Sequence, residues 1–587
     1  MAFLDETSRR GLRREMSKLA AELTAEGSMR LRLPGKTRDA LQKLPDTVAA
    51  FAGRGEMDML THLEGSVRLM QACAQRTALE GGARLPACGE KTRIERVAGA
   101  LMDLGAGDLS DLQLGLMAFD QVQGLTMAEY WAFPEAMRVH LCRAYQKAAE
   151  GILGAARDWC AAEDWIYTGG GEEISGKRPA FYERALQLAL EMEKPEMRQK
   201  IENTLRRADT APDACVRLAQ ERRGLALMRI DGIAAMVRVL EAADWQKAFE
   251  AVSATEAELR EDPAGTYPAM TADSRSALRG QVTCLARRLG VGETTVARYA
   301  VSAARENRQD PIRGGICWWI YEDEGRRALA RRMGVKKPLP RMIPDPRGAG
   351  YRALFLGIFA LLTLCLSALA GSLWWTFALA APVWRLTGAW MAQAGTRLRR
   401  PRPVLQMEYE TLPEDRRTLV TLPVLISSAR SGRKLCENLE TLGCLEQDEN
   451  LDYLLLGDFP DAAQQDMPCD GEILAAVREC MEEMNRRAGR EKYFYLHRGR
   501  TEAAADGIFR GRARKPGALM ALGRLICGEA GEFTAEGEAC GRIAGRYRYV
   551  ITLDADTRML PGTAHRMVGA IAHPLNARRE WLSLIHI

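Results

Sequence analysis

The stretch "YVITLDADTRML", residues 549 to 560, places Asp554 and Asp556 directly after a run of apolar residues. Such a run predicts a short buried strand of a parallel sheet, and ligands bind at the carboxyl ends of strands in open α/β sheets. Alternation along an extended chain puts both carboxylates on one side. A hard cation such as Mg²⁺ or Mn²⁺ relieves their repulsion and can still bind phosphate oxygens. We therefore expect a metal site here, the alternative being an Asp-rich surface turn.

The elements around this motif alternate between strand and helix from residue 403 to residue 587. Helical segments separate four short apolar strands, predicted at "RTLVTLPVLIS" from Arg417, "LDYLLLGDF" from Leu451, "KYFYLHRG" from Lys492, and "YRYVITLDAD". This order predicts an α/β domain with a mainly parallel sheet and helices on both faces. Asp458 ends the second strand, so we expect it on the same edge as the two later aspartates.

Two classes of enzyme have strands that end in an Asp-x-Asp motif. In haloacid-dehalogenase-like phosphatases the motif is DxDxT on the first strand, and its first Asp is a nucleophile. Here the Thr comes one place early and three strands precede the motif. In GT-A glycosyltransferases the motif follows several strands of a nucleotide-binding fold and holds a metal on a sugar nucleotide. The order of elements favours the transferase.

The whole chain is long enough for several domains. It has 587 residues and a formal net charge of +5, which is small for this length and does not indicate a nucleic-acid binder. No CxxC pair occurs among its 14 cysteines, so neither a disulfide framework nor a zinc site is indicated. Residues 1–345 show helical periodicity throughout, which predicts an all-helical N-terminal domain. The N-terminus lacks a signal-peptide core, so we expect this domain in the cytoplasm.

A membrane segment is expected at residues 350–400. Ala353 to Trp384 carry no charge, and this run exceeds the roughly 20 residues that cross a bilayer. Arginines flank it on both sides, which favours a hairpin turning near Gly371 and Ser372 with both flanks in the cytoplasm. A single tilted span is the alternative, because the arms are short and Arg385 would have to snorkel.

Several stretches resemble the N-terminal part of the cyclic β-1,2-glucan synthases, which are large bacterial inner-membrane enzymes. They are "GLTMAEYWAFPEAMR", "DPAGTYPAM", "YEDEGRRAL", "LPEDRRTLVTLPVLISS", "LLLGDFPDA" and "YVITLDADTRMLPGTAHRMVGAIAHPLN". The last is the most specific, because the acidic turn, the helix and the "AHPLN" tail occur together. In that family a processive GT-A module uses UDP-glucose to extend a β-1,2-glucan.

The resemblance implies roles for particular residues. Asp554 and Asp556 would hold Mg²⁺ or Mn²⁺ against the diphosphate of the UDP-glucose donor, and the growing glucan would be the acceptor. Asp458 would lie near the uracil or ribose, and the turn around Thr421 and Pro423 would contact the nucleotide. Two positions depart from the family pattern, since Ala518 and Gly523 stand where a Lys and an Asn are usual.

The resemblance also implies where the chain works and what it lacks. We expect a partial GT-A domain at 403–587, with the catalytic base and the acceptor site beyond Ile587 and no turnover by this chain alone. It implies a bacterial inner membrane location, with the N-terminal and glycosyltransferase domains cytoplasmic. The alternatives are the phosphatase and a non-catalytic membrane-associated scaffold.

Overall fold

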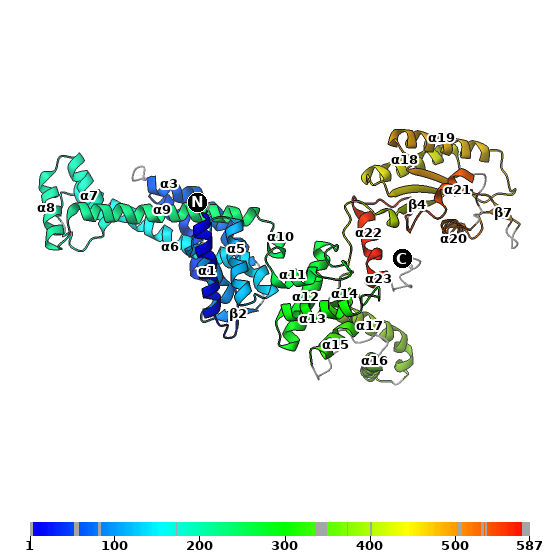
Figure 1. Cartoon of the computed structure of the whole chain (residues 1–587), viewed down its shortest axis with the longest axis horizontal. Coiled ribbons are helices and arrows are strands. Elements are labelled where there is room, and N and C mark those ends of the chain that lie inside the picture. Colours follow the sequence, from blue (N-terminus) through cyan, green and yellow to red (C-terminus); the bar gives the residue numbers. More distant parts are fainter. Residues whose placement is uncertain are drawn as a thin grey trace. The chain divides into compact units, whose positions relative to one another are not determined.

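The computed structural model describes residues 4–51, 58–79, 84–171, 173–334, 349–372, 374–398, 402–502, 507–529, 533 and 537–577. The chain forms two compact units, the first comprising Met1–Glu261 and Arg279–Val301, the second Asp262–Leu278 and Ser302–Ile587. Each unit has its own helices and strands (Figure 1), and each has its own hydrophobic core.

The first unit is built mainly of helices. They are α1 (Glu6–Glu22), α2 (Gly35–Ala49), α3 (Asp58–Leu79), α4 (Arg93–Asp103), α5 (Leu109–Val122), α6 (Met127–Tyr167), α7 (Pro179–Glu191), α8 (Pro195–Arg207), α9 (Pro212–Ala242), α10 (Trp245–Glu250) and α11 (Ala254–Arg260). Residues of α12 (Ala272–Leu289) and α13 (Glu293–Glu306) are divided between the two units.

The expectation of an all-helical first region was wrong in one detail. β1 (Ser28–Arg30), β2 (Arg84–Cys88) and β3 (Lys91–Thr92) form a small antiparallel sheet. These strands are too short to show an alternating apolar pattern, so periodicity could not reveal them. β3 leads directly into α4, where Thr92 and Glu95 form a reciprocal capping box.

The longest helix, α6, has a well-defined start. Thr126 and Glu129 form a capping box, and the buried Glu129 also accepts two hydrogen bonds of 2.8 and 2.6 Å from Arg93. The capping box satisfies N–H groups that the first turn of a helix leaves unpaired. The pairing with Arg93 compensates a carboxylate that would be costly to bury alone. From there α6 runs through the main core of the unit.

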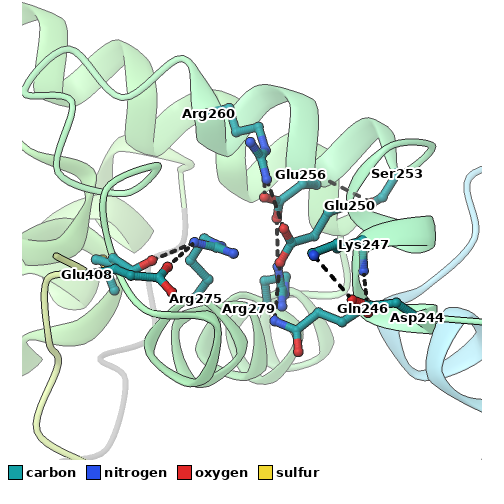
Figure 2. A network of polar contacts seen from close by, with 11 residues as sticks. Asp244, Gln246, Lys247, Glu250, Ser253, Glu256, Arg260, Arg275, Arg279 and Glu408 are labelled. Carbon is teal, nitrogen blue, oxygen red and sulfur yellow. Dashed lines mark hydrogen bonds and ion pairs between the residues drawn. The ribbon is translucent and has the colours of Figure 1, made fainter. Parts of the chain in front are cut away.

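A second charged cluster surrounds Arg279 in the first unit (Figure 2). Its Nη1 donates to Glu250 at 2.9 Å and to Glu256 at 3.0 Å, and Arg260 contacts the same two carboxylates at 2.9 Å each. The guanidinium also lies 5.9 Å from the ring centroid of Trp131. In the second unit, Arg275 lies 3.8 Å from the carboxylate of Glu408.

The apolar run expected in a membrane forms a helical hairpin. α16 (Ala349–Leu369) and α17 (Trp375–Leu398) turn at Gly371, whose φ is +72°, and pack through Phe355 and Phe359 on Trp384. Among the described residues, Tyr351–Leu369 is the one helical stretch long and apolar enough to cross a membrane, with a mean hydropathy of 2.1.

The second unit contains the predicted parallel sheet. Its strands are β4 (Thr418–Leu425), β5 (Leu451–Asp458), β6 (Tyr493–Arg498) and β9 (Tyr549–Thr552), in the spatial order β6-β5-β4-β9 and all parallel. The other elements are α14 (Ile316–Tyr321), α15 (Asp323–Arg332), a 3₁₀ helix (Glu414–Arg416), α18 (Ala429–Leu445), α19 (Asp470–Ala488), the antiparallel pair β7 (Thr501–Glu502) and β8 (Phe509–Arg510), α20 (Arg514–Ile526), α21 (Gly537–Ile543), α22 (Thr563–Ala572) and α23 (Pro574–Ala577).

Helices cover both faces of this sheet, as predicted (Figure 1). On one face α18, α19 and α22 share a core with Val420, Leu422 and Ile551. On the other face α20 and α21 pack on Leu419, Leu454 and Phe494. Successive side chains of β4 therefore pack into two separate apolar layers, one on each face of the sheet. A strand that is buried on both faces requires this arrangement.

The strand before the acidic motif is shorter and less buried than its sequence predicts. β9 has 4 residues, and of these Ile551 is buried whereas Val550 and Thr552 are exposed. It pairs with β4 and forms one edge of the sheet. An apolar run of this length does not distinguish a central strand from an edge strand, because pairing partners come from distant parts of the chain.

Candidate functional site

The acidic motif lies at the carboxyl edge of the sheet, in a turn that follows β9. The Leu553 N–H donates to the carbonyl of Thr421 at 3.0 Å, and the Thr557 N–H donates to the carbonyl of Asp554 at 2.9 Å, which closes the turn. The premise that both acids continue an extended strand was therefore wrong, because regular pairing stops at Thr552. Asp554 and Asp556 are both exposed and stand at the first and third positions of this turn.

A lysine lies against the first aspartate. Lys515 Nζ forms an ion pair with Asp554, and both side chains are partly exposed. Lys515 is the second residue of α20, and the chain enters this helix with positive φ at Ala513 (+53°) and Arg514 (+47°), a conformation that L-residues rarely adopt. The turn thus already binds one cationic group at the end of β9.

The carboxylate of Asp458 is buried in an ion pair at the ends of β5 and β6. Arg498 Nε donates to Oδ1 at 2.8 Å and Nη2 to Oδ2 at 2.5 Å, and both side chains are less than a tenth exposed. Arg498 also donates hydrogen bonds to the carbonyls of Arg512 and Arg514. These two bonds hold the loop before α20. A Cβ at Gly511 would lie 2.9 Å from Oδ2 of Asp458, so this loop can approach only because it carries a glycine there.

Asp458 therefore lies on the same edge as the acidic turn but not beside it. β4 separates β5 from β9, and both oxygens of Asp458 are engaged by Arg498. Sequence analysis did not identify Arg498. The strand register places Arg498 opposite Asp458. Its position as a basic residue at the carboxyl end of the third predicted strand is the sequence feature that could have identified it.

Thr421 and Pro423 lie on the intervening strand, β4. Thr421 is fully buried, and its Oγ1 has no hydrogen-bond partner among the described residues. Pro423 is half-buried, and its backbone nitrogen is on the side of β4 that faces β9. At this position β9 has already ended, because its pairing with β4 stops at Thr552. A proline is tolerated here because no strand hydrogen bond is lost on that side.

One of the two departures from the family pattern is explained by packing. Ala518 is 1% exposed and lies in the apolar layer between α20 and the sheet. A residue buried in this way does not contact a ligand at the edge. The exposed Lys515, one turn earlier on the same helix, is the cationic group that reaches the acidic turn.

The acidic turn offers a limited set of metal donors. No group of three or more His, Cys, Asp or Glu side chains suited to a metal ion occurs in the part of the chain that the structure describes. Mg²⁺ is usually bound in proteins by one or two carboxylates together with substrate phosphates and water. Asp554 and Asp556 fit that mode, since both are exposed, and the ion pair with Lys515 shows that a positive group fits at this turn.

Comparison with known proteins gives one informative relative. No family model matches the chain. The cyclic beta-(1,2)-glucan synthase NdvB of Rhizobium meliloti (strain 1021) is 26% identical over 404 residues. The resemblance to the cyclic β-1,2-glucan synthases is confirmed. The match covers 64% of this chain but only 14% of the glucan synthase, so this chain corresponds to a small part of that relative's length.

Proposed function

We propose that this chain carries the donor-binding part of a metal-dependent, membrane-associated processive glucosyltransferase that builds β-1,2-glucan from UDP-glucose. The observation that carries the proposal is the exposed Asp554–Asp556 turn at the carboxyl edge of a parallel sheet, in a chain similar to a cyclic β-1,2-glucan synthase. This edge is where open α/β sheets bind their ligands.

The residues of the edge have separate roles in this proposal. Asp554 and Asp556 hold Mg²⁺ or Mn²⁺ against the diphosphate, with phosphate oxygens completing the ligand set. The metal supplies electrostatic stabilisation of the charge that builds on the departing UDP. Lys515 adds a positive charge beside Asp554. Pro423, which is half-buried on β4, contacts the nucleotide, whereas the fully buried Thr421 does not reach it.

Asp458 acts together with its partner. Its oxygens are fixed by Arg498, and the same arginine holds the carbonyls of Arg512 and Arg514 ahead of α20. A carboxylate orientated in this way is suited to accept a hydrogen bond from the uracil or ribose. The pair also fixes the loop that leads to Lys515, so Asp458 contributes to the shape of the site as well as to its charge.

The hairpin of α16 and α17 supports association with a bilayer. Leu354, Leu361, Leu364 and Leu369 on α16 are each more than half exposed. Exposed leucines on a helix of spanning length suit a lipid environment. We propose that the hairpin inserts into the bacterial inner membrane, with the growing glucan formed at the cytoplasmic sheet.

Donor binding tests the proposal directly. Titration of the purified chain with UDP-glucose should give saturable binding in the presence of Mn²⁺ and none in EDTA. Asp556→Ala should abolish the metal-dependent binding while the circular dichroism spectrum stays unchanged. Asp415→Ala is the matched control, because Asp415 is also an exposed carboxylate and precedes β4, so it lies at the opposite edge of the sheet.

Two results would count against the proposal. Equal UDP-glucose binding with and without a divalent cation would remove the role of the acidic turn. Hydrolysis of a phosphate monoester by a chain that ignores UDP-sugars would indicate phosphatase chemistry at Asp554 instead.

A further inference from the structure

His565 lies between two buried carboxylates near the start of α22. Its Nδ1 is 2.9 Å from Glu446 Oε2, and its Nε2 is 2.8 Å from Asp448 Oδ2. The side chains of Glu446 and Asp448 are 4% and 2% exposed, and that of His565 is 18% exposed. We call these three residues the His565 clamp.

Each ring nitrogen of His565 faces one carboxylate oxygen. An imidazole nitrogen that carries a proton donates to such an oxygen, and a hydrogen bond to a carboxylate is stronger than one between neutral groups. The ring therefore connects the two carboxylates to the start of α22.

Backbone N–H groups also hold the two carboxylates. Oδ2 of Asp448 accepts from Leu412 and contacts His565, Oδ1 of Asp448 accepts from Asn450, and Oε1 of Glu446 accepts from Ala564. These bonds fix the carboxylates in place. The clamp is therefore held from the sheet side as well as from α22.

Other charged groups around the clamp have partners of their own. Lys492 Nζ donates to the carbonyls of Gly443 and Glu446, and Arg490 donates to the carbonyl of Asp448 and to the carboxylate of Asp452. The Tyr453 ring lies beneath Lys492, and burial raises the pKa of its phenol, with a further contribution from the charges of Glu446 and Asp448. Arg417 donates to Asn450, and Arg566 follows His565 on α22. Among these groups, His565 is the residue of α22 whose side chain contacts both Glu446 and Asp448.

The clamp fixes the far end of the segment that carries the acidic turn. Residues 553 to 562 leave β9 at the carboxyl edge of the sheet and reach α22, where Ala564 and His565 bind Glu446 just before β5 begins. Between these two ends Met559 is the buried side chain of the segment, whereas Leu560 is 70% exposed. The segment therefore has few apolar contacts of its own, and its placement depends on its ends.

We propose that His565 is a positioning residue that holds the 553–562 segment, and with it the acidic turn, in place by contacting Glu446 and Asp448 together. When a side chain that cannot reach both carboxylates replaces the ring, one of the two contacts is lost and the segment opens more often. The clamp itself does not depend on the proposed function. The role of the turn as a metal site does depend on it.

Hydrogen–deuterium exchange of the full chain without metal or nucleotide tests this clamp. Protection of residues 553–577, corrected for intrinsic exchange rates, should fall about tenfold or more from the wild type to His565→Gln, the scale of losing a hydrogen bond to a charged group. His565→Arg keeps donors that can face both carboxylates, so it should stay protected.

The control for this experiment is His62→Gln. His62 also faces a carboxylate, Asp231 at 3.3 Å, but both side chains are about half exposed and lie in the first unit. This variant should leave the exchange of residues 553–577 unchanged. If His565→Arg does not fold, the double variant Glu446→Gln, Asp448→Asn replaces it. This double variant removes both charged acceptors, so its protection should fall as in His565→Gln.

The proposal is overturned if residues 553–577 are as well protected in His565→Gln as in the wild type, or if His565→Arg loses protection as His565→Gln does. Failure of UDP-glucose to bind would leave this result intact, because the exchange is measured without donor. A positive exchange result combined with absent donor binding would separate the clamp from the proposed glucosyltransferase.

Discussion

Arg498 and Asp458 face each other at the ends of neighbouring parallel strands, joined by two hydrogen bonds of 2.8 and 2.5 Å. Both are buried, so their attraction is little screened by solvent. The same arginine binds two backbone carbonyls of the loop before α20. This pair therefore links the sheet edge to the helix that presents Lys515.

Arg498→Met should lower the free energy of unfolding by about 3 to 5 kcal/mol, because it leaves a buried carboxylate without its partner. Urea denaturation followed by circular dichroism measures the change. Arg514→Met is the control, since the Arg514–Asp461 pair is 58% and 37% exposed and such pairs contribute about 1 kcal/mol or less. A loss as small as that of the control would show that Asp458 is not dependent on Arg498.

Lys515→Gln should tighten the binding of Mn²⁺ to the chain without nucleotide. The ammonium group occupies Asp554 and repels a second cation, and two unit charges about 4 Å apart in water interact by about 1 kcal/mol, or roughly fivefold in affinity. Titration followed by the paramagnetic resonance of free Mn²⁺ gives the constant. Weaker binding in Lys515→Gln would mean that the lysine organises the turn rather than competing for it.

His573 should make the second unit less stable in mild acid. Burial lowers the pKa of this histidine to about 4. Because the folded pKa lies below the ordinary value of about 6.5, the unfolded chain takes up a proton that the folded chain refuses. The stabilisation is complete above pH 6.5 and is lost as the pH falls from 6.5 toward 4, by about 2 kcal/mol at pH 5.

Urea titrations at pH 7 and pH 5 measure this loss in the wild type and in His573→Asn. The asparagine can still accept the hydrogen bond that the Leu575 N–H donates to Nδ1 of His573, but it does not titrate. The variant should therefore lose less stability between the two pH values. Burial also lowers the pKa of His497, to about 3, so part of the acid sensitivity should remain. An unchanged difference would show that His573 is accessible to protons in the folded chain.

Deletion of residues 349–398 should release the chain from lipid. In flotation with phospholipid vesicles, the full chain should rise with the vesicles and the deleted chain should stay at the bottom of the gradient. Leu361→Arg, at a side chain that is 64% exposed near the middle of α16, should weaken insertion by about 2.5 to 3.5 kcal/mol. Flotation of the deleted chain would place the lipid contact elsewhere.

The sequence predicted the strands and helices of the second unit because their apolar runs are long and regular. The strands predicted from Arg417, Leu451 and Lys492 are β4, β5 and β6, with bounds shifted by at most a few residues. The helical hairpin could also be predicted from the sequence, because Gly371 interrupts a long uncharged apolar run.

The partners of the site residues could not be predicted in the same way. The pairing of Asp458 with Arg498, and the position of β9 at the edge, depend on which strands become neighbours. Neither follows from local periodicity, which reports how a segment is buried and not what it contacts. The ion pair of Lys515 with Asp554 joins the start of α20 to the turn after β9, and these are far apart in the chain, so spacing within either segment gives no signal of it.

The order of strands also has a consequence for biosynthesis. β4 can pair with β5 as soon as the short stretch between them has left the ribosome, but its other side waits for β9, which is made only after residues 459–548. During that interval one side of β4 is an unprotected template for wrong pairing within the nascent polypeptide or with a neighbouring one. Chaperone dependence and slow maturation are expected because the acidic strand is made after the other three strands of the sheet.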